Sequence, residues 1–254
     1  MAWMPRTICF VDACYTTPQA RCQAARRLGG KPVLEWIVRA ATDAQRVDGV
    51  VVITSDDPAN ELVDKIVPPD VPVFRAFGTT PLECFVAGIE RFSAEAAVRV
   101  AGTWPFVDSV LLDNLVLKAE QVVDADFIGY CGSDNNPAAL ARIGLLPEWY
   151  RGSSLRRAAR RLGAGFSGNP AEFIYNFEKR FRIRHLPLPA ELDVTELDPL
   201  CSPQDAWDMT ETIFETLGPD VHNWRRVVRV IIDFCRHHQL HRHSSVKARS
   251  LEPE

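Results

Sequence analysis

The sequence predicts an α/β fold built on a mostly parallel mixed sheet, because strand-like runs alternate with helical patterns over the first half of the chain. The strand-like runs are short, apolar and rich in β-branched residues, and they fall at 7–13, 49–55, 71–74 and 96–102. The helical patterns between them fall at 33–44, 59–67 and 82–92. Such alternation builds βαβ units, and open α/β sheets bind ligands where their strands reach the carboxyl end.

The helices are predicted from apolar residues at helical spacing. Two such stripes comprise Val33, Leu34, Ile37, Val38 and Ala41 in the first helix, and Leu82, Phe85, Val86 and Ile89 in the third. Thr80 followed by Pro81 fits an N-cap with proline at the first helical position. A further helix is expected at 109–122 and a further strand at 126–131.

The alternation ends after Cys131, where turn-forming residues follow. Beyond them we expect a helix at 155–162, a glycine-rich linker at 163–170, strands at 181–186 and 191–196, a helix at 202–217 and an amphipathic helix at 223–240. These patterns predict one α/β domain over 1–219, an amphipathic C-terminal helix within 220–243 and a disordered tail over 244–254. The amphipathic helix packs on its own domain or forms an oligomer contact, and the sequence leaves both readings open.

The composition is that of an ordinary globular protein. Of 254 residues, 46% are hydrophobic and 24% are charged, and the net charge of -4 gives no reason to expect nucleic acid or an anionic membrane as a partner. No apolar run approaches the length of a membrane span. The seven cysteines are scattered without C-x-x-C spacing, which predicts free thiols in a reducing cytoplasm. Cys14 is expected to be the most reactive of them if its loop is exposed.

Four ordered segments resemble the cytidylyltransferases that make CMP-sugars. LGGKPVLEWIVRA at 28–40 closely resembles a segment of the spore-coat-polysaccharide and 3-deoxy-manno-octulosonate members of that family, and VVVITSDDP, DVPVFRAF and RVAGTWPFVDSVLLD follow in the family's order. The resemblance implies a Rossmann-like nucleotidyltransferase of the glycosyltransferase-A type. It also implies a homodimer and a role in sugar-nucleotide or surface-glycan metabolism, such as polysaccharide biosynthesis.

The family's phosphate-binding signature falls on residues 12–23, and the match is poor. Its three basic positions hold Cys14, Gln19 and Gln23, and its flexible glycine is Thr16. A neutral glutamine donates hydrogen bonds but does not balance phosphate charge. The resemblance places nucleotide contacts at Asp12, Ala13, Thr16, Thr17, Gln19, Gln23, Asp56, Arg75 and Gly102.

The metal-binding carboxylates implied by the resemblance are also replaced. RVAGTWPFVD resembles the motif R-x-x-G-D-x-P-x-x-D with Thr103 in place of the magnesium-binding aspartate. The second such position holds Cys201, although Asp198 or Asp193 serves if the local alignment shifts. Magnesium needs hard oxygen ligands, so Thr103 and Cys201 are a poor pair and no metal site is expected.

Two hypotheses follow from these replacements. The first is a non-catalytic nucleotide- or sugar-binding homologue, a pseudoenzyme. The second is an active nucleotidyl- or glycosyltransferase with a rearranged site, in which Arg21, Arg26 and Arg27 bind phosphate and Asp108 or Asp12 supplies a carboxylate, with magnesium bound only in that case.

Several residues have a structural reading beside the functional one. Asp56 and Asp57 either contact a base or ribose or start a helix, while Arg75 and Arg99 either bind ligand or stabilise the strand ends. A basic helical face formed by Arg156, Arg157, Arg160 and Arg161 is expected to be a solvated or dimer-facing surface.

Overall fold

The computed structural model describes residues 6–78, 80–133, 137, 146–163, 165–193, 203–219 and 223–249. It divides into two compact units, Met1–Leu188 and Pro189–Glu254. The boundary lies before the helices at 203–249, whereas the sequence had placed the end of the first domain at 219. The two units are therefore described one at a time.

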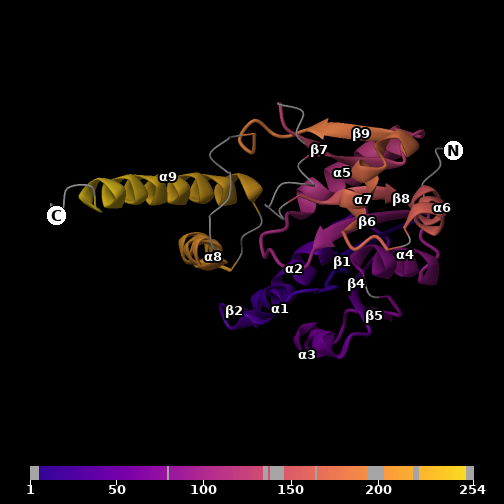
Figure 1. The fold of residues 1–254 in the computed structure, drawn as a ribbon, viewed down its shortest axis with the longest axis horizontal. Coiled ribbons are helices and arrows are strands. Elements are labelled where there is room, and N and C mark those ends of the chain that lie inside the picture. Colours follow the sequence, from indigo (N-terminus) through magenta and orange to yellow (C-terminus); the bar gives the residue numbers. More distant parts are fainter. Residues whose placement is uncertain are drawn as a thin grey trace. The chain divides into compact units, whose positions relative to one another are not determined.

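A seven-stranded sheet forms the centre of the first unit, in the order β5-β4-β1-β6-β8-β7-β9 (Figure 1). The strands are β1 (Thr7–Asp12), β4 (Gly49–Ser55), β5 (Val73–Ala76), β6 (Ala96–Ala101), β7 (Phe127–Cys131), β8 (Glu148–Arg151) and β9 (Ile183–Pro187). Only β8 runs antiparallel to its neighbours among these pairings, and the other ladders are parallel. The predicted mostly parallel mixed sheet is confirmed.

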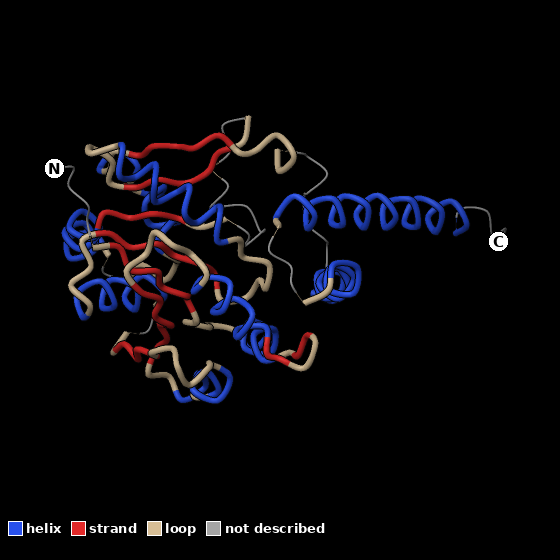
Figure 2. The backbone as a smooth tube through the Cα atoms, turned by 180° about the vertical axis from the view of Figure 1, so that it is seen from behind, coloured by secondary structure: helices blue, strands red, loops and turns tan. Residues whose placement is uncertain are grey.

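Helices cover both faces of this sheet (Figure 2). They are α1 (Pro18–Ala25), α2 (Val33–Thr42), α3 (Leu62–Ile66), α4 (Pro81–Arg91), α5 (Ser109–Gln121), α6 (Gly152–Leu162) and α7 (Pro170–Asn176), with short 3-10 turns η1 (Pro58–Asn60) and η3 (Glu178–Arg180). Helix α4 packs beside α6 and α7, while α2 packs beside α5. A small hairpin of β2 (Arg27–Leu28) and β3 (Lys31–Pro32) joins α1 to α2.

Aromatic rings fill the core between the sheet and the helices α4, α6 and α7. The rings of Phe10 and Phe85 meet edge to face at 5.5 Å between centroids, and Tyr150 meets both Phe85 and Phe127 at 5.1 Å. Phe173 of α7 belongs to the same buried cluster. Edge-to-face pairs of this kind add to the free energy gained by burying apolar surface, so this core fixes the strand ends that carry the site.

Helices α1 and α7 and strand β8 are among the elements of the first unit that were not predicted. Helix α1 occupies part of the expected phosphate loop, and it begins with the Thr17 N-cap and Pro18 at its first position. Helix α7 follows the expected glycine-rich linker, and it begins with a capping box between Asn169 and Glu172. Strand β8 is short, and its pairing with β6 and β7 depends on residues distant in sequence. Conversely, the expected strand at 191–196 is a turn over its described residues 191–193.

The second unit contains two helices that pack on each other, α8 (Pro203–Leu217) and α9 (Trp224–Arg249). Over residues 224–236 of α9, the part whose side chains are described, the buried side chains are Trp224, Val227, Val228, Ile231 and Cys235, which form the apolar stripe predicted from the sequence. The helix continues past residue 243, where a disordered tail was expected to begin. Within the described residues, no helix has the length and apolarity needed to cross a membrane.

Asp126 fastens the start of β7 to two other elements. Its carboxylate accepts hydrogen bonds from the Ser154 hydroxyl at 2.6 Å and from the Arg182 backbone N–H at 3.0 Å, and it pairs with the Arg182 guanidinium at 3.1 Å. Burial acts to raise the pKa of Asp126, but the bonds from Arg182 and Ser154 outweigh it and lower the pKa to about 2. The folded-state pKa lies below the unfolded value, so the stabilisation is present above about pH 4 and is lost as the pH falls towards 2.

We predict that Asp126→Asn lowers the free energy of unfolding at pH 7 by about 1–2 kcal/mol, a value that allows for solvent screening of Arg182. The difference between wild type and variant should shrink as the pH falls from 4 towards 2. Urea titrations followed by circular dichroism at several pH values measure both quantities. The matched control is Asp124→Asn, since Asp124 forms an exposed pair with Arg184 and should change stability by no more than about 0.5 kcal/mol. A pH-independent difference for Asp126→Asn would contradict the assignment.

Candidate functional site

The candidate site lies where neighbouring parallel strands reach their carboxyl ends. Strand β1 ends at Asp12, β4 at Ser55 and β6 at Ala101, and the loops that follow are bonded to one another. The Gly102 N–H donates to the Asp12 carbonyl at 2.9 Å, and the Ala13 N–H donates to the Ile53 carbonyl at 2.8 Å. The expected residues Asp12, Ala13 and Gly102 are therefore brought together at one edge.

A buried ionic network crosses this edge. The Arg99 Nε donates to Asp12 Oδ2 at 2.7 Å, and its Nη1 lies 3.2 and 3.3 Å from the two oxygens of Glu148. The Tyr150 hydroxyl donates to Glu148 Oε2 at 2.5 Å, and the Cys14 N–H donates to Asp12 Oδ1 at 3.1 Å. The Arg99, Asp12 and Glu148 side chains are only 12%, 5% and 6% exposed. Both carboxylate oxygens of Asp12 are therefore engaged in hydrogen bonds within the protein.

The charges of this network perturb one another. Burial acts to lower the pKa of Arg99, but the carboxylates of Glu148 and Asp12 outweigh it and hold the pKa above its usual range. Burial raises the pKa of Glu148, and the opposing effects of Arg99 and of the Tyr150 hydrogen bond only partly offset it. One cation thus lies between two buried acidic groups, and removing it would leave both without a counter-charge.

Gly102 permits the close approach of the loops after β1 and β6. A Cβ atom at this position would lie 2.4 Å from the Asp12 carbonyl oxygen and 2.9 Å from the Tyr15 hydroxyl. That hydroxyl donates to the Gly102 carbonyl at 2.7 Å, and burial raises the pKa of Tyr15, so the phenol keeps the proton that it donates. Gly102 matches the glycine of the family motif, and the close packing of the backbone requires a glycine at this position.

The expected phosphate loop is partly helical. Thr17 uses its hydroxyl to cap α1 by accepting from the Ala20 N–H at 3.2 Å. Thr16 and Gln19 are exposed, and Gln23 is half-buried within α1. None of these four side chains is cationic, so each can offer a ligand only neutral hydrogen-bonding groups.

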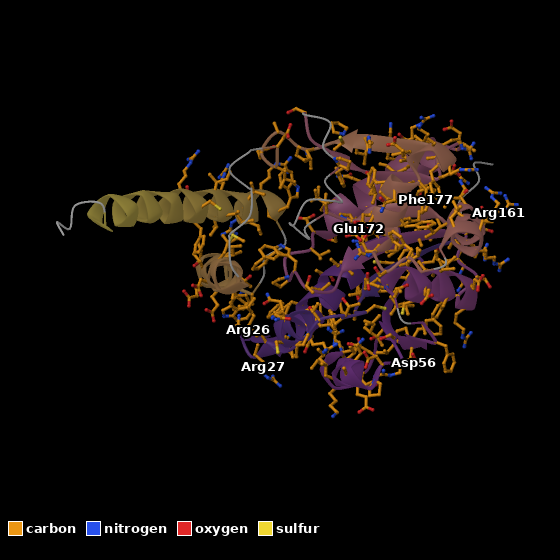
Figure 3. All side chains as sticks on the ribbon, in the orientation of Figure 1. Arg26, Arg27, Asp56, Arg161, Glu172 and Phe177 are labelled. Carbon is orange, nitrogen blue, oxygen red and sulfur yellow. The ribbon has the colours of Figure 1, made fainter. Side chains whose placement is uncertain are left out.

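The arginines of the alternative site lie around α1. Arg21 donates to the Tyr15 carbonyl at 2.9 Å, and Arg27 donates to the Gly30 carbonyl at 2.5 Å. Figure 3 shows Arg26 and Arg27 close to each other near α1 and β2, and well apart from Asp56. Arg21 thus holds the backbone of the loop.

Of the two metal positions implied by the resemblance, the structure describes the first. Thr103 is half-buried in the turn after β6, and a hydroxyl there cannot replace a carboxylate charge. Cys201 and Asp198 lie outside the described residues, and Asp193 follows a turn in the second unit. No group of three His, Cys, Asp or Glu side chains arranged to hold a metal occurs among the residues described. At the first metal position the chain thus offers a hydroxyl oxygen, which is a weaker magnesium ligand than a carboxylate.

Asp108, the carboxylate of the alternative site, caps helix α5. Its Oδ1 accepts from the Val110 N–H at 2.8 Å and from the Leu111 N–H at 3.1 Å, and the residue is 4% exposed. Asp57 similarly caps η1 by accepting from the Ala59 N–H at 2.8 Å. Asp108 and Asp57 thus both have a structural role as helix caps.

Asp56 lies on a cleft of about 400 Å³ that is also lined by Glu61, Asp64, Lys65 and Arg75. Asp56 is exposed, so its carboxylate faces solvent beside the ends of β4 and β5. Arg75 donates to the carbonyls of Ser55 at 3.1 Å and Asn60 at 3.2 Å and pairs with Asp64. Asp56 and Arg75 are the two expected ligand contacts in this cleft. The Arg75 side chain is already bonded to other groups of the protein.

The expectation for Cys14 depended on an exposed loop, and the structure buries this residue. A hydrogen bond with Cys84 and burial raise the pKa of the Cys14 thiol, whereas Cys22 on α1 is exposed. Cys22 is therefore the reactive thiol at this edge. Thr80 caps α4, as expected, and forms a capping box with Glu83.

Glu148, Tyr150 and Tyr15 were missed by reasoning from the sequence. Glu148 and Tyr150 lie on the unpredicted strand β8, and Tyr15 lies in the loop that was aligned with the phosphate signature. A charged residue at the head of the apolar run EWY was the available signal for Glu148.

The fold and its polar strand edge define an α/β protein with a mostly parallel mixed sheet. Residues 24–137 match the family model described as Cytidylyltransferase, which confirms the resemblance over that part of the chain. A search of curated proteins finds no match.

Solved structures confirm the fold. A cytidylyltransferase from Leptospira borgpetersenii is similar with a TM-score of 0.70 and 17% identity, over 89% of this chain and 92% of that one. A CMP:2-keto-3-deoxy-manno-octonic acid synthetase complexed with CTP has a TM-score of 0.60 and 11% identity, over 84% and 100%. A 4-diphosphocytidyl-2C-methyl-D-erythritol synthase from Anaerococcus prevotii has a TM-score of 0.55 and 10% identity, over 82% and 96%.

We predict that Gly102→Ala destabilises the protein by roughly 2–4 kcal/mol, because the added methyl group meets backbone that must shift. Gly49→Ala is the matched control, since its Cβ would meet only the Ile8 Cδ1 atom at 3.9 Å. The control should change stability by less than about 1 kcal/mol. Urea unfolding monitored by tryptophan fluorescence compares the two. Equal stability of both variants would show that the two loops do not approach as closely as described.

Proposed function

We propose that the protein is a non-catalytic, nucleotide- or sugar-binding homologue of the cytidylyltransferases, with a binding or regulatory role in sugar-nucleotide or surface-glycan metabolism. The observation that carries this proposal is the engagement of the carboxylates at the site. Asp12 is bonded to Arg99 and to the Cys14 N–H, Glu148 is bonded to Arg99 and Tyr150, and Asp108 caps α5. These groups support the fold, and recruiting them to a metal would break those bonds.

The segment aligned with the family's phosphate-binding signature supports the same proposal. Transfer of a nucleotidyl group depends on cations that neutralise the triphosphate and the charge that develops in the transition state. Gln19 and Gln23 are neutral, and the Arg21 guanidinium already donates to a loop carbonyl. A neutral hydrogen bond is about half as strong as a charge-assisted one, so this loop is suited to weak binding.

The proposed ligand is a nucleotide or a sugar. One structure with the same fold is a synthetase complexed with CTP, and the loops after β1, β4 and β6 are the corresponding place in an open α/β sheet. Asp56 on its cleft and the exposed Thr16 and Gln19 supply hydrogen-bonding groups there. No magnesium is needed for binding of this kind.

We predict no appreciable magnesium-dependent transfer of CMP from CTP to sugar acids or phosphosugars. Each lost charge-stabilising group at a phosphoryl centre costs several kcal/mol, and each 1.36 kcal/mol is about tenfold in rate. Pyrophosphate release should therefore stay at the buffer background over a panel of acidic sugars. Calorimetry should show weak CTP binding that magnesium improves by less than about threefold, which is under 1 kcal/mol.

Thr103→Asp is the informative variant, because it restores a carboxylate at the metal position and should increase the effect of magnesium on CTP binding. Turnover by the unmodified protein at an ordinary enzymatic rate, about 1 s⁻¹ or faster, would overturn the proposal in favour of the rearranged site. Replacing Arg21, Arg26 and Arg27 in turn would then identify the phosphate ligands.

We also propose a cytoplasmic homodimer. Helix α9 carries the half-buried apolar side chains Val230 and Ile232 beside its buried stripe, which suits a contact with a second chain. Light scattering of the full chain should give a mass of about twice 28.5 kDa. Ile232→Asp should reduce that mass towards the monomer, and Arg229→Ser on the exposed side should not. A monomer for the unmodified chain would contradict the proposal.

A further inference from the structure

Two buried thiols meet beside the candidate site. Cys14 lies in the loop after β1, Cys84 lies on α4, and both share a cluster with Ala76 in which they are 9% and 0% exposed. The Cys14 Sγ lies 3.9 Å from the Ile53 carbonyl oxygen, and the Cys84 Sγ lies 3.7 Å from the Gly78 carbonyl oxygen. We propose that Cys14 and Cys84 form an oxidative modification site, at which a peroxide converts the two thiols into a disulfide.

The backbone fixes the position of each residue in this cluster. The Cys14 N–H is bonded to Asp12 Oδ1, and the Cys84 N–H donates to the Thr80 carbonyl at 3.0 Å in the first turns of α4. A disulfide needs about 2.05 Å between the sulfurs and about 3.5–4.5 Å between the Cβ atoms. Two thiols that pack in one cluster must therefore move closer together to form this bond.

The chemistry balances with peroxide as the only co-reactant. One thiol sulfur attacks a peroxide oxygen, the O–O bond breaks, and a sulfenic acid and water form. The second sulfur then attacks the sulfenic sulfur, so that the S–S bond forms, the S–O bond breaks, and the hydroxyl leaves as water with the second thiol proton. The two thiols lose two electrons in total, and peroxide is reduced to water.

The surroundings make this site slow and selective. The Cys14 thiol stays protonated because its bond with Cys84 and its burial raise its pKa, and only the thiolate attacks peroxide readily. Exposed Cys22 reacts first with any oxidant or alkylating agent. A small oxidant reaches the buried pair more easily than a bulky alkylating agent does, and the neighbouring thiol then captures the sulfenic acid before a second oxidation.

The disulfide would join two segments that lie far apart in the sequence. It would tie the loop that carries the Asp12 bond to the start of α4, and the closed loop runs from Cys14 to Cys84. Closing a long loop restricts the unfolded chain and raises stability. The inference concerns the thiols alone and holds whether or not the protein binds a nucleotide.

The experiment uses the full chain with Cys22→Ser, which removes the exposed thiol. After treatment of the folded protein with hydrogen peroxide, the intact mass should fall by about 2 Da. A non-reducing peptide map should show a Cys14–Cys84 link that dithiothreitol reverses. The midpoint of thermal unfolding should rise by about 5 °C or more in the oxidised form. Cys22→Ser with Cys9→Ala should still form the link, since Cys9 belongs to β1 and not to the cluster.

Three results would overturn the proposal. These are a link that joins other cysteines, full retention of both thiols while circular dichroism shows a native fold, and oxidation of either sulfur to the sulfinic acid without a link. Cys22→Ser with Cys84→Ser should lose the link. If that variant fails to fold, the peptide map of the Cys22→Ser parent decides the question alone.

Discussion

The carboxyl edge of the sheet depends on the buried guanidinium of Arg99. It binds Asp12 of β1 and Glu148 of β8 from its place on β6, so one cation joins three strands. Buried ion pairs are costly to form, and removing one partner typically costs about 3–5 kcal/mol because a buried charge is left unpaired. Asp12 in turn positions the Cys14 N–H, and its carbonyl receives the Gly102 N–H. The two loops that frame the candidate site are thus positioned through Arg99.

The same interaction limits what the site can do. A carboxylate that neutralises an arginine and accepts a backbone N–H has little capacity left for a cation, and its loss would disturb the sheet. Tyr150 adds a further bond to Glu148 and belongs to the aromatic core, so the polar edge and the core are directly connected. These links support the proposed binding role, because binding of a metal by Asp12 or Glu148 would require these groups to exchange partners.

The sequence predicted the elements whose pattern is local. An apolar run or stripe of neighbouring residues predicted each of the strands β1, β4 and β6 and each of the helices α2, α4 and α5. Strand β8 could not be predicted in this way, because four residues carry little periodicity and its pairing comes from distant strands. Helices α1 and α7 begin with Thr17-Pro18 and Asn169-Pro170, the same cap and proline pattern that predicted α4. Alignment with the phosphate loop and the high glycine content hid that signal in these two places.

The site was harder to predict, because the residue types that cap helices also bind ligands. Thr, Asp and Asn accept backbone N–H groups at helix starts, and in an α/β sheet the helices start at the same edge where ligands bind. Thr17, Asp57 and Asp108 are caps, a role that only the hydrogen-bond geometry distinguishes from phosphate or metal binding. Asp12 and Gly102 were brought together as predicted, since their strands are neighbours, yet both support the backbone. Asp56 is exposed on its cleft, so a ligand contact with its carboxylate would cost the fold little.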